Sequence, residues 1–272
     1  MSLYRAPMLY IFFETHNLAN QRELLESAIG IPVIEIEPHL PHHHHGVIKY
    51  DSGGVIISLN LSGAGRFPRD GSDGVVTVFN VHPDWSFMKI LTNPTISVSG
   101  DGLFTDEHGH HFLFQAAPID NPAPARWPVV EEFRLRVRDI AESVSFYRDV
   151  LGLELMAQTE TTARFATGTV GLALELGERA PDGRRILYDT YLLVFYCENI
   201  RESFAKLAER GLQFRPPRVD FNEVGGTVRF DDPSGHQFCL YEPSKECLTW
   251  ESGPKVLEIA ARNAMAAETA AK

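Results

Sequence analysis

One pattern recurs four times along the 272 residues: an apolar, strand-like run is followed directly by a helix-like segment. The expected helix starts lie roughly 55 to 70 residues apart, at Asn17, Asp84, Asp139 and Asn199. The distance from Asn17 to Gly30 equals that from Asp139 to Gly152, so the first and third helices have matching caps and terminal glycines. Runs such as GGVIISLNL and VGLALELGE supply further strands. The sequence therefore predicts a βαβββ unit used four times.

A proline-rich segment, AAPIDNPAPARWP at residues 116–128, interrupts this pattern near the middle of the chain. We predict an N-terminal domain at residues 1–118, a linker at 119–128, a C-terminal domain at 129–246 and a helical tail at 247–272. The two domains end alike, in FTDEHGHHFLFQAAP and FDDPSGHQFCLYEP, as expected of a tandem repeat. The Ala-rich tail, with Ser252 as a cap, would dock on the body of the chain or on a second subunit in a homodimer.

The charge balance limits the class of partner. The 36 acidic against 25 basic side chains give a net charge of −11, which argues against contact with nucleic acid or anionic membranes. No run approaches the ~20 apolar residues that cross a bilayer. Three cysteines without zinc spacing, and no export signal, indicate a cytoplasmic protein with reduced thiols. A small molecule is therefore the expected partner.

Two segments of the second half carry a family signature. VRDIAESVSFYRDVLGLEL, followed by FDDPSGHQFCLYEP, resembles the vicinal oxygen chelate superfamily, which includes glyoxalase I, bleomycin-resistance proteins, fosfomycin-resistance enzymes and extradiol dioxygenases. The resemblance implies an α+β fold in which four βαβββ modules pair into two glyoxalase-like domains, one from each half. Their curved mixed sheets form cups, and a C-terminal helix is added. Members that use a metal hold it on inward-facing strand positions, where it activates a substrate with two neighbouring oxygens.

The residues at these positions decide whether a metal is expected. The C-terminal domain has Glu132, Glu175, Leu192 and Cys239 there, and the N-terminal domain has Tyr10, Ser58, Val76 and Leu113. Leucine cannot bind a metal, and Cys239 stands where metal-binding relatives have glutamate. We therefore expect no metal cofactor. The alternative is a divalent ion such as Fe, Mn, Ni or Zn on Glu132, Glu175 and Cys239.

Strand alternation places charged residues on the cup side of the C-terminal domain. The expected ligand-binding set is Glu132, Arg134, Arg136, Glu175, Tyr196, Gln237, Cys239 and Tyr241. Such a cup would bind an aromatic or carboxylated molecule, with an arginine contacting the carboxylate. Glu132 and Glu175 are the candidates for a general base. The alternative is an exposed cross-strand ion network without a ligand.

Three functions remain open from the sequence. The first is a small-molecule-binding protein or metal-independent enzyme that uses the C-terminal cup. The second is a metal-dependent lyase or ring-cleaving dioxygenase, and an isomerase also belongs to the reaction types that the family implies. The third is a non-catalytic, partner-binding pseudo-enzyme, suggested by the degenerate N-terminal domain, and blocked cups would favour it. Fold analogy does not decide among them.

A histidine tract, PHLPHHHHG at residues 38–46, stands out in the first half. It coincides with an insertion between two expected strands, and none of its histidines occupies a ligand position of the fold. Alternate residues of an extended run point in opposite directions, so few of these side chains could reach one ion. We interpret the tract of His39–His45 as a rim loop with incidental affinity for Ni or Zn.

Overall fold

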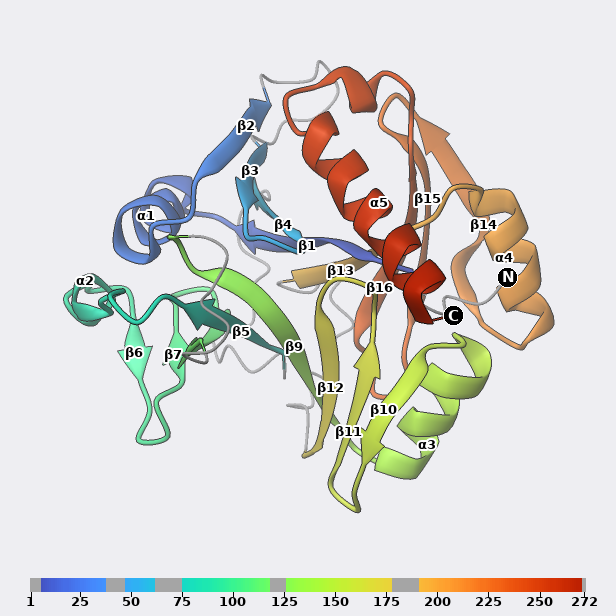
Figure 1. The fold of residues 1–272 in the computed structure, drawn as a ribbon, viewed down its shortest axis with the longest axis horizontal. Coiled ribbons are helices and arrows are strands. Elements are labelled where there is room, and N and C mark those ends of the chain that lie inside the picture. Colours follow the sequence, from blue (N-terminus) through green and yellow to red (C-terminus); the bar gives the residue numbers. More distant parts are fainter. Residues whose placement is uncertain (1–5, 38–46, 62–74, 118–125, 178–190, 271–272) are drawn as a thin grey trace.

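A computed structural model describes residues 6–37, 47–61, 75–117, 126–177 and 191–270. The histidine tract and the whole glycine-rich segment GAGRFPRDGSDG at residues 63–74 lie outside the described residues. The described strands form two eight-stranded mixed sheets, sheet I and sheet II (Figure 1). This confirms the predicted α+β class with four βαβββ modules.

Sheet I has the strand order β14-β15-β16-β13-β1-β4-β3-β2. Its strands are β1 (Met8–Thr15), β2 (Val33–Glu37), β3 (Val47–Asp51), β4 (Ile56–Leu61), β13 (Tyr191–Tyr196), β14 (Phe214–Asn222), β15 (Gly225–Asp231) and β16 (Gln237–Pro243). Sheet II has the order β10-β11-β12-β9-β5-β8-β7-β6. Its strands are β5 (Val75–Val81), β6 (Ser97–Val98), β7 (Phe104–Thr105), β8 (His111–Ala116), β9 (Val129–Val137), β10 (Glu154–Gln158), β11 (Thr162–Ala166) and β12 (Gly171–Leu176).

Local capping signals predicted three helix starts correctly. The helical segments are α1 (Leu18–Arg22) with η1 (Glu23–Ile29), α2 (Met88–Leu91), α3 (Ile140–Ser145) with η2 (Phe146–Val150), α4 (Ile200–Glu209), η3 (Cys247–Thr249) and α5 (Gly253–Ala270). Asn17, Asp139 and Asn199 each accept a hydrogen bond from the backbone N–H three residues ahead. The fourth start differs, because α2 begins at Met88 rather than at Asp84 and has no side-chain cap.

Strand pairing crosses the two halves of the chain. Strand β1 pairs antiparallel with β13, so sheet I combines the first and fourth modules. Strand β5 pairs antiparallel with β9, so sheet II combines the second and third. Each sheet therefore joins one module from before the proline-rich segment to one from after it, whereas the resemblance led us to expect both modules of a cup in one half.

Two related turns hold the modules of each half together. The β7–β8 turn reaches α1, where Gln21 Nε2 donates to Asp106 Oδ2 at 2.7 Å. The β15–β16 turn reaches η2, where Tyr147 Oη donates to Asp232 Oδ2 at 2.8 Å. Both carboxylates are buried, and one continuous apolar core lies between the two sheets. The two modules of each half are thus connected by these turns and by the apolar core, whereas the two modules of each sheet are connected by backbone hydrogen bonds between strands.

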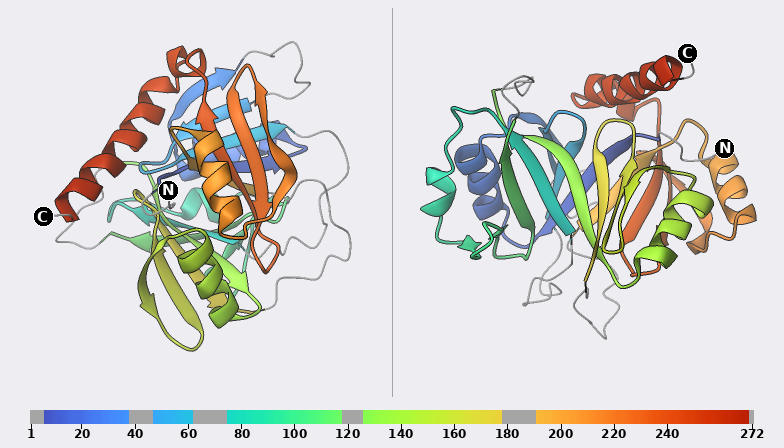
Figure 2. Two further views of the ribbon diagram at one scale, coloured as in Figure 1. Left: turned by 90° about the vertical axis from the view of Figure 1, so that its right-hand side faces the viewer. Right: turned by 60° about the horizontal axis from the view of Figure 1, so that its bottom comes forward.

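The predicted helical tail forms α5 and docks on the body of its own chain. Val256 and Ile259 pack on one face of sheet I, against a cluster of Leu9, Tyr10, Ile56, Val194, Cys239 and Tyr241. Figure 2 shows α5 as a layer outside sheet I. At its start, Glu35, Lys49 and Ser252 form a buried hydrogen-bonded set. Among the described residues, no helix is long and apolar enough to span a membrane.

Candidate functional site

Sheet II carries a cluster of four charged side chains, which we call the charged face: Glu132, Arg134, Arg164 and Glu175. Glu132 in β9 is only 3% exposed, and its Oε1 accepts from Arg134 Nε at 2.8 Å. Its Oε2 accepts from Arg164 Nε of β11 at 2.8 Å and also from Arg164 Nη2. Glu175 of β12 lies 3.7 Å from Arg134 Nη1. One buried carboxylate therefore orients two guanidinium groups.

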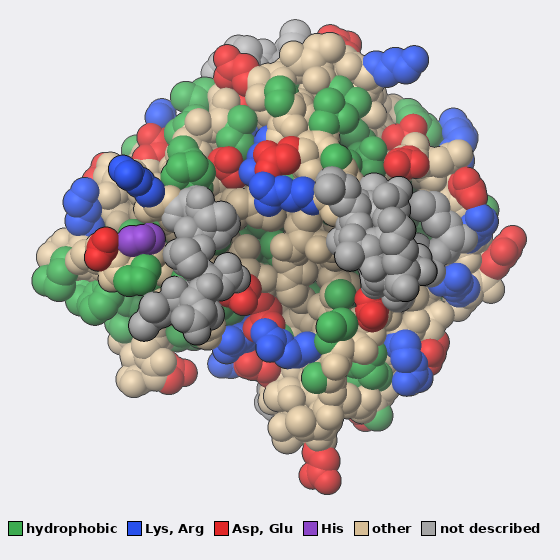
Figure 3. Space-filling model, viewed as in Figure 1, with side chains coloured by type: hydrophobic (Ala, Val, Ile, Leu, Met, Phe, Trp, Pro, Cys, Tyr) green, Lys and Arg blue, Asp and Glu red, His purple; other side chains and the backbone are tan. Residues whose placement is uncertain are grey.

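Strand register explains why these side chains meet. Strand β12 runs parallel to β9 and places Gly171 beside Glu132, while Arg164 of β11 pairs with Ala173 of β12. A Cβ atom at Gly171 would lie 3.3 Å from Glu132 Oε2, so the missing side chain leaves room for the carboxylate. Figure 3 shows basic and acidic side chains together over β9 and β12. The arrangement follows from strand alternation, as predicted for Glu132, Arg134 and Glu175.

The charged face remains accessible although its central carboxylate is buried. The side chain of Arg164 is 60% exposed, that of Glu175 41% and that of Arg134 26%. Arg136 is exposed beside Glu175 in the β9–β12 register. Three guanidinium groups lie here beside the carboxylates of Glu132 and Glu175, and Arg136 also interacts with the charge of Asp101, so Arg134 and Arg164 are the cations that an anion would meet. The buried Glu132 distinguishes the cluster from a solvent-exposed ion network.

The other four residues predicted for this cup lie on sheet I: Tyr196, Gln237, Cys239 and Tyr241. Tyr241 Oη donates to the backbone oxygen of Val224 at 2.7 Å. Burial raises the pKa of the Cys239 thiol to about 11, so this thiol stays protonated near neutral pH. The structure therefore does not bring these four to Glu132, because their module pairs into the other sheet. Since α5 packs on the same sheet I face, that cup is filled by the chain itself.

Sequence reasoning missed Arg164 of the charged face. Its segment, TARFA, alternates small or apolar residues with polar ones, which is the signal of a half-buried strand. Reading that strand beside VGLALEL would have placed the arginine on the same face as Glu175.

A second group of side chains could hold a metal ion. One ligand atom from each of Asp106, His108 and His110, all buried, lies within 4.8 Å of the others. Among the described residues, this is the only group of three or more His, Cys, Asp or Glu side chains placed so that they could share one ion. Glu132, Glu175 and Cys239, the metal set considered from the sequence, do not form one, since Cys239 lies on the other sheet.

Electrostatics at this group favour a cation. Burial and the adjacent His110 lower the pKa of His108 to about 4, so the imidazole is neutral and keeps a nitrogen lone pair. Burial pushes the pKa of Asp106 upward, but His110, His108 and the Gln21 amide together hold it below its ordinary value. A neutral imidazole and an ionised carboxylate are the protonation states that bind divalent metals.

Gln21 provides an independent sign of a missing ligand at this group. The residue is 1% exposed, and its Oε1 is buried without a hydrogen-bond partner. Its Nε2 lies 2.7 Å from Asp106 Oδ2 and 2.9 Å from His108 Nδ1. If the amide were rotated by half a turn, Oε1 would lie beside Asp106 Oδ2 and His108 Nδ1, where a bound cation would give this oxygen a partner. The residues thus fit an ion bound by two imidazoles, a carboxylate and an amide oxygen.

Comparisons with known proteins agree with this fold. Residues 129–240 match the model of the Glyoxalase/Bleomycin resistance protein/Dioxygenase superfamily. The metallothiol transferase FosB of Staphylococcus haemolyticus is 29% identical over 111 residues, which cover 40% of this chain and 80% of the relative. FosB of Staphylococcus saprophyticus is 28% identical over 107 residues, covering 39% of this chain and 70% of the relative.

Solved structures show the likeness over nearly the whole chain. A putative dioxygenase from Bacillus subtilis superposes with a TM-score of 0.65 at 12% identity, covering 95% of this chain and 96% of that one. Glyoxalase I from Zea mays gives a TM-score of 0.59 at 14% identity, covering 94% and 96%. At such identities the likeness establishes the fold alone.

The fold defines an α+β protein with two composite sheets, each built from both halves of the chain, and α5 covers one face of sheet I. Residues 129–240 match the glyoxalase/bleomycin resistance/dioxygenase superfamily, also called the vicinal oxygen chelate superfamily, and the whole chain has the fold of the solved structures named above. The expectation of no metal cofactor was wrong. The relatives are named metallothiol transferases, and Asp106, His108 and His110 converge in this chain. These donors were missed because they lie in the turn between β7 and β8, whereas the sequence reasoning examined strand positions and the histidine tract.

Proposed function

We propose that this chain is a metal-dependent transferase or lyase that acts on a small anionic molecule bound at the charged face. The convergence of Asp106, His108 and His110 carries the metal dependence, because three side chains with ligand atoms are held together in a buried site. The names of the relatives support the same reaction class.

The charged face supplies the substrate site in this proposal. Arg134 and Arg164 present guanidinium groups whose donor pairs match a carboxylate or phosphonate group. Glu132 already engages both arginines, so their orientation is set before a substrate arrives. Preorganised cations of this kind stabilise negative charge that develops during a reaction.

The two glutamates take different roles. Both oxygens of Glu132 accept from guanidinium groups and the side chain is buried, so it acts as a positioning residue. Glu175 is more exposed and lies beside Arg134. It is therefore the carboxylate that can accept a proton from a substrate bound at the two arginines.

The metal ion would be held by Asp106, His108 and His110, with Gln21 as the fourth donor. Because all four side chains are buried, the site is closed to substrate, as structural metal sites are. When bound, the ion would link the β7–β8 turn to α1 and so stabilise the half of the chain that contributes β5 and β8 to sheet II. Metal removal would thus act on activity through the fold.

Metal analysis of untagged protein tests the metal part of the proposal. We expect one equivalent of a divalent ion per chain, and a fall in melting temperature after chelation that reloading reverses. The variants His108→Gln and Asp106→Asn should lose the ion. His82→Gln, and replacement of the histidine tract by serines, are matched controls that should keep it. The proposed site would be contradicted if the protein contained no stoichiometric metal, or if the metal were lost when the histidine tract is replaced.

Binding of small anions tests the substrate part separately. Calorimetry with phosphonate and carboxylate ligands should show saturable binding that Arg134→Ala and Arg164→Ala weaken roughly tenfold or more, the value of a charged hydrogen bond. Arg148→Ala, at an exposed pair outside the charged face, should leave the affinity unchanged. Equal affinities in all three variants would contradict the charged face as the substrate site.

A further inference from the structure

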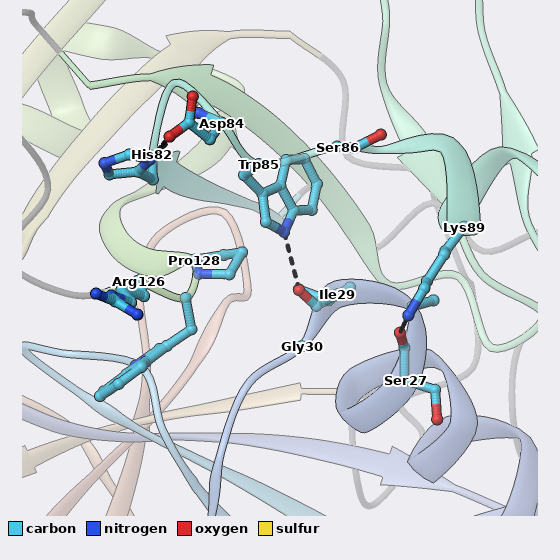
Figure 4. Close-up of a pocket in the computed structure, with 12 residues that line it drawn as sticks. Ser27, Ile29, Gly30, His82, Asp84, Trp85, Ser86, Lys89, Arg126 and Pro128 are labelled. Carbon is cyan, nitrogen blue, oxygen red and sulfur yellow. Dashed lines mark hydrogen bonds and ion pairs between the residues drawn. The ribbon is translucent and has the colours of Figure 1, made fainter.

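A pocket of about 740 Å³ lies apart from the charged face and from the metal donors. It is enclosed by the end of η1 at residues 27–30, the segment after β5 at residues 82–89, and residues 126–128 (Figure 4). Its volume falls in the range of sites that bind small molecules. None of the residues assigned to the proposed function lines it, so it needs an explanation of its own.

One wall of the pocket is a rigid aromatic surface. The indole of Trp85 stacks on Phe114 with ring centres 4.8 Å apart, and Phe114 stacks on the buried Phe79 at 5.4 Å. Trp85 Nε1 donates to the backbone oxygen of Ile29 at 3.0 Å, which fixes the ring plane (Figure 4). A held indole gives a flat ligand a stacking surface at little entropic cost.

The pocket also carries positive charge. Lys89 and Arg126 approach it from opposite sides in the view of Figure 4. Among the described residues, no carboxylate pairs with either of them, and Lys89 Nζ has only a long contact of 3.4 Å to the backbone oxygen of Ser27. Asp84 at the rim is turned toward solvent and pairs with His82 at 3.5 Å. Unpaired cations beside an aromatic wall favour an anion attached to a ring.

A third feature of this site is an unused donor. Trp127 lines the pocket, and its Nε1 is buried without an acceptor among the described residues. Burying a donor without a partner is unfavourable. This nitrogen has almost no accessible surface, so the pocket as it stands does not reach it, and the aromatic wall and the two cations define the ligand.

We propose that this pocket binds a small aromatic carboxylate. The ring lies against Trp85, and the positive charges of Lys89 and Arg126 on the two sides of the pocket attract the carboxylate. The site is distinct from the charged face, where the proposed reaction takes place. It therefore adds a second ligand class to this chain and does not depend on the proposed function.

Tryptophan fluorescence can report on this pocket directly, since two of the three tryptophans line it. In Trp250→Phe protein, the remaining emission comes from Trp85 and Trp127 alone. Titration with 2-naphthoate should quench this emission saturably, with one equivalent in calorimetry. Neutral 2-naphthamide should bind roughly tenfold or more weakly, because it lacks the charge that Lys89 and Arg126 recognise.

Matched variants locate the bound anion. The double variant Lys89→Met/Arg126→Met should weaken 2-naphthoate roughly tenfold or more, and both side chains are exposed, so folding should be retained. The double variant Lys206→Met/Arg148→Met removes the same charge elsewhere and should bind normally. Absence of saturable binding, equal affinity for acid and amide, or loss of binding in Arg134→Ala would each overturn the proposal.

Discussion

Replacement of Glu35 by glutamine should release α5 from sheet I. Glu35 Oε2 accepts from the backbone N–H of Ser252 at 2.7 Å, directly before the helix. Its Oε1 accepts from Lys49 Nζ at 3.1 Å, and Lys49 also donates to Ser252 Oγ at 3.2 Å. All three side chains are buried, so this set anchors the start of the helix in a region that excludes water.

The expected cost can be compared with the binding of the helix itself. Removing one partner of a buried ion pair costs about 3–5 kcal/mol, because it leaves the other charge uncompensated. The lower end applies here, since the glutamine oxygen still accepts and the ring of Trp250 lies 5.2 Å from Lys49 Nζ. Full burial of Val256 and Ile259 contributes about 1.5–3 kcal/mol each. The loss is thus comparable to the apolar contribution of α5, and the helix should detach in a measurable fraction of molecules.

Hydrogen–deuterium exchange followed by mass spectrometry measures this detachment. We expect faster exchange in peptides of α5 and increased binding of an apolar dye to the uncovered face of sheet I. Glu202→Gln, at an exposed pair with Lys206, is the matched control and should exchange like the parent protein. Unchanged exchange of α5 in Glu35→Gln, with an unfolding free energy within about 1 kcal/mol of the parent, would refute the reasoning.

Acid should imitate the substitution. Burial raises the pKa of Glu35, but the Ser252 hydrogen bonds and the charge of Lys49 outweigh it, and the pKa lies below its ordinary value. A carboxylate with a lowered pKa gives stability that is complete above its unfolded pKa of about 4.3 and is lost as the pH falls through the folded value. Detachment of α5 should therefore increase below about pH 4 in the parent protein and depend less on pH there in Glu35→Gln.

Three further outcomes follow from single residues. Burial raises the pKa of Cys197 to about 12 and that of Cys239 to about 11, so iodoacetamide at pH 8 should label both only in denaturant, as read by mass spectrometry. Gly225→Ala should lower the unfolding free energy in urea by about 2 kcal/mol or more, because φ is +133° and a Cβ atom would lie 2.1 Å from a backbone oxygen. Tyr147→Phe should cost about 1–3 kcal/mol in the same assay, since it leaves buried Asp232 without the hydroxyl donor.

Local signals in the sequence were sufficient for the elements of the fold. The caps at Asn17, Asp139 and Asn199 involve contacts within three residues, and chain-wide packing does not alter them. The segment after Asp84 is the exception. There the indole of Trp85 stacks on Phe114 of β8, and α2 forms only from Met88 onward. A tertiary contact has displaced the helix start that the local pattern indicated.

The alternation of side chains along strands predicted the placement of half of the residues expected in the cup, but not of the other half. Glu132, Arg134 and Glu175 lie on neighbouring strands of one module, so parity alone brings them together. Cys239 and Tyr241 belong to the next module, whose place depends on which first strands pair. Backbone hydrogen bonds between strands do not depend on the side chains, and each of the four modules begins with a strand that has buried apolar residues, so several pairings of first strands are compatible with the sequence. The sequence therefore leaves the choice of partner module open.

The observed choice has a consequence for the matched region at residues 129–240. Within it, β9 and β13 are the first strands of their modules, and each pairs on one side with a strand from the other half, β5 and β1 respectively. Without those partners, both would be open sheet edges, which proteins avoid leaving uncovered. The region that resembles the relatives is thus continuous in sequence but divided between two sheets in space. The charged face uses only β9, β11 and β12 of this region, but β5 and β8 of the first half complete the sheet that carries it, and among the described residues α5 packs on sheet I instead.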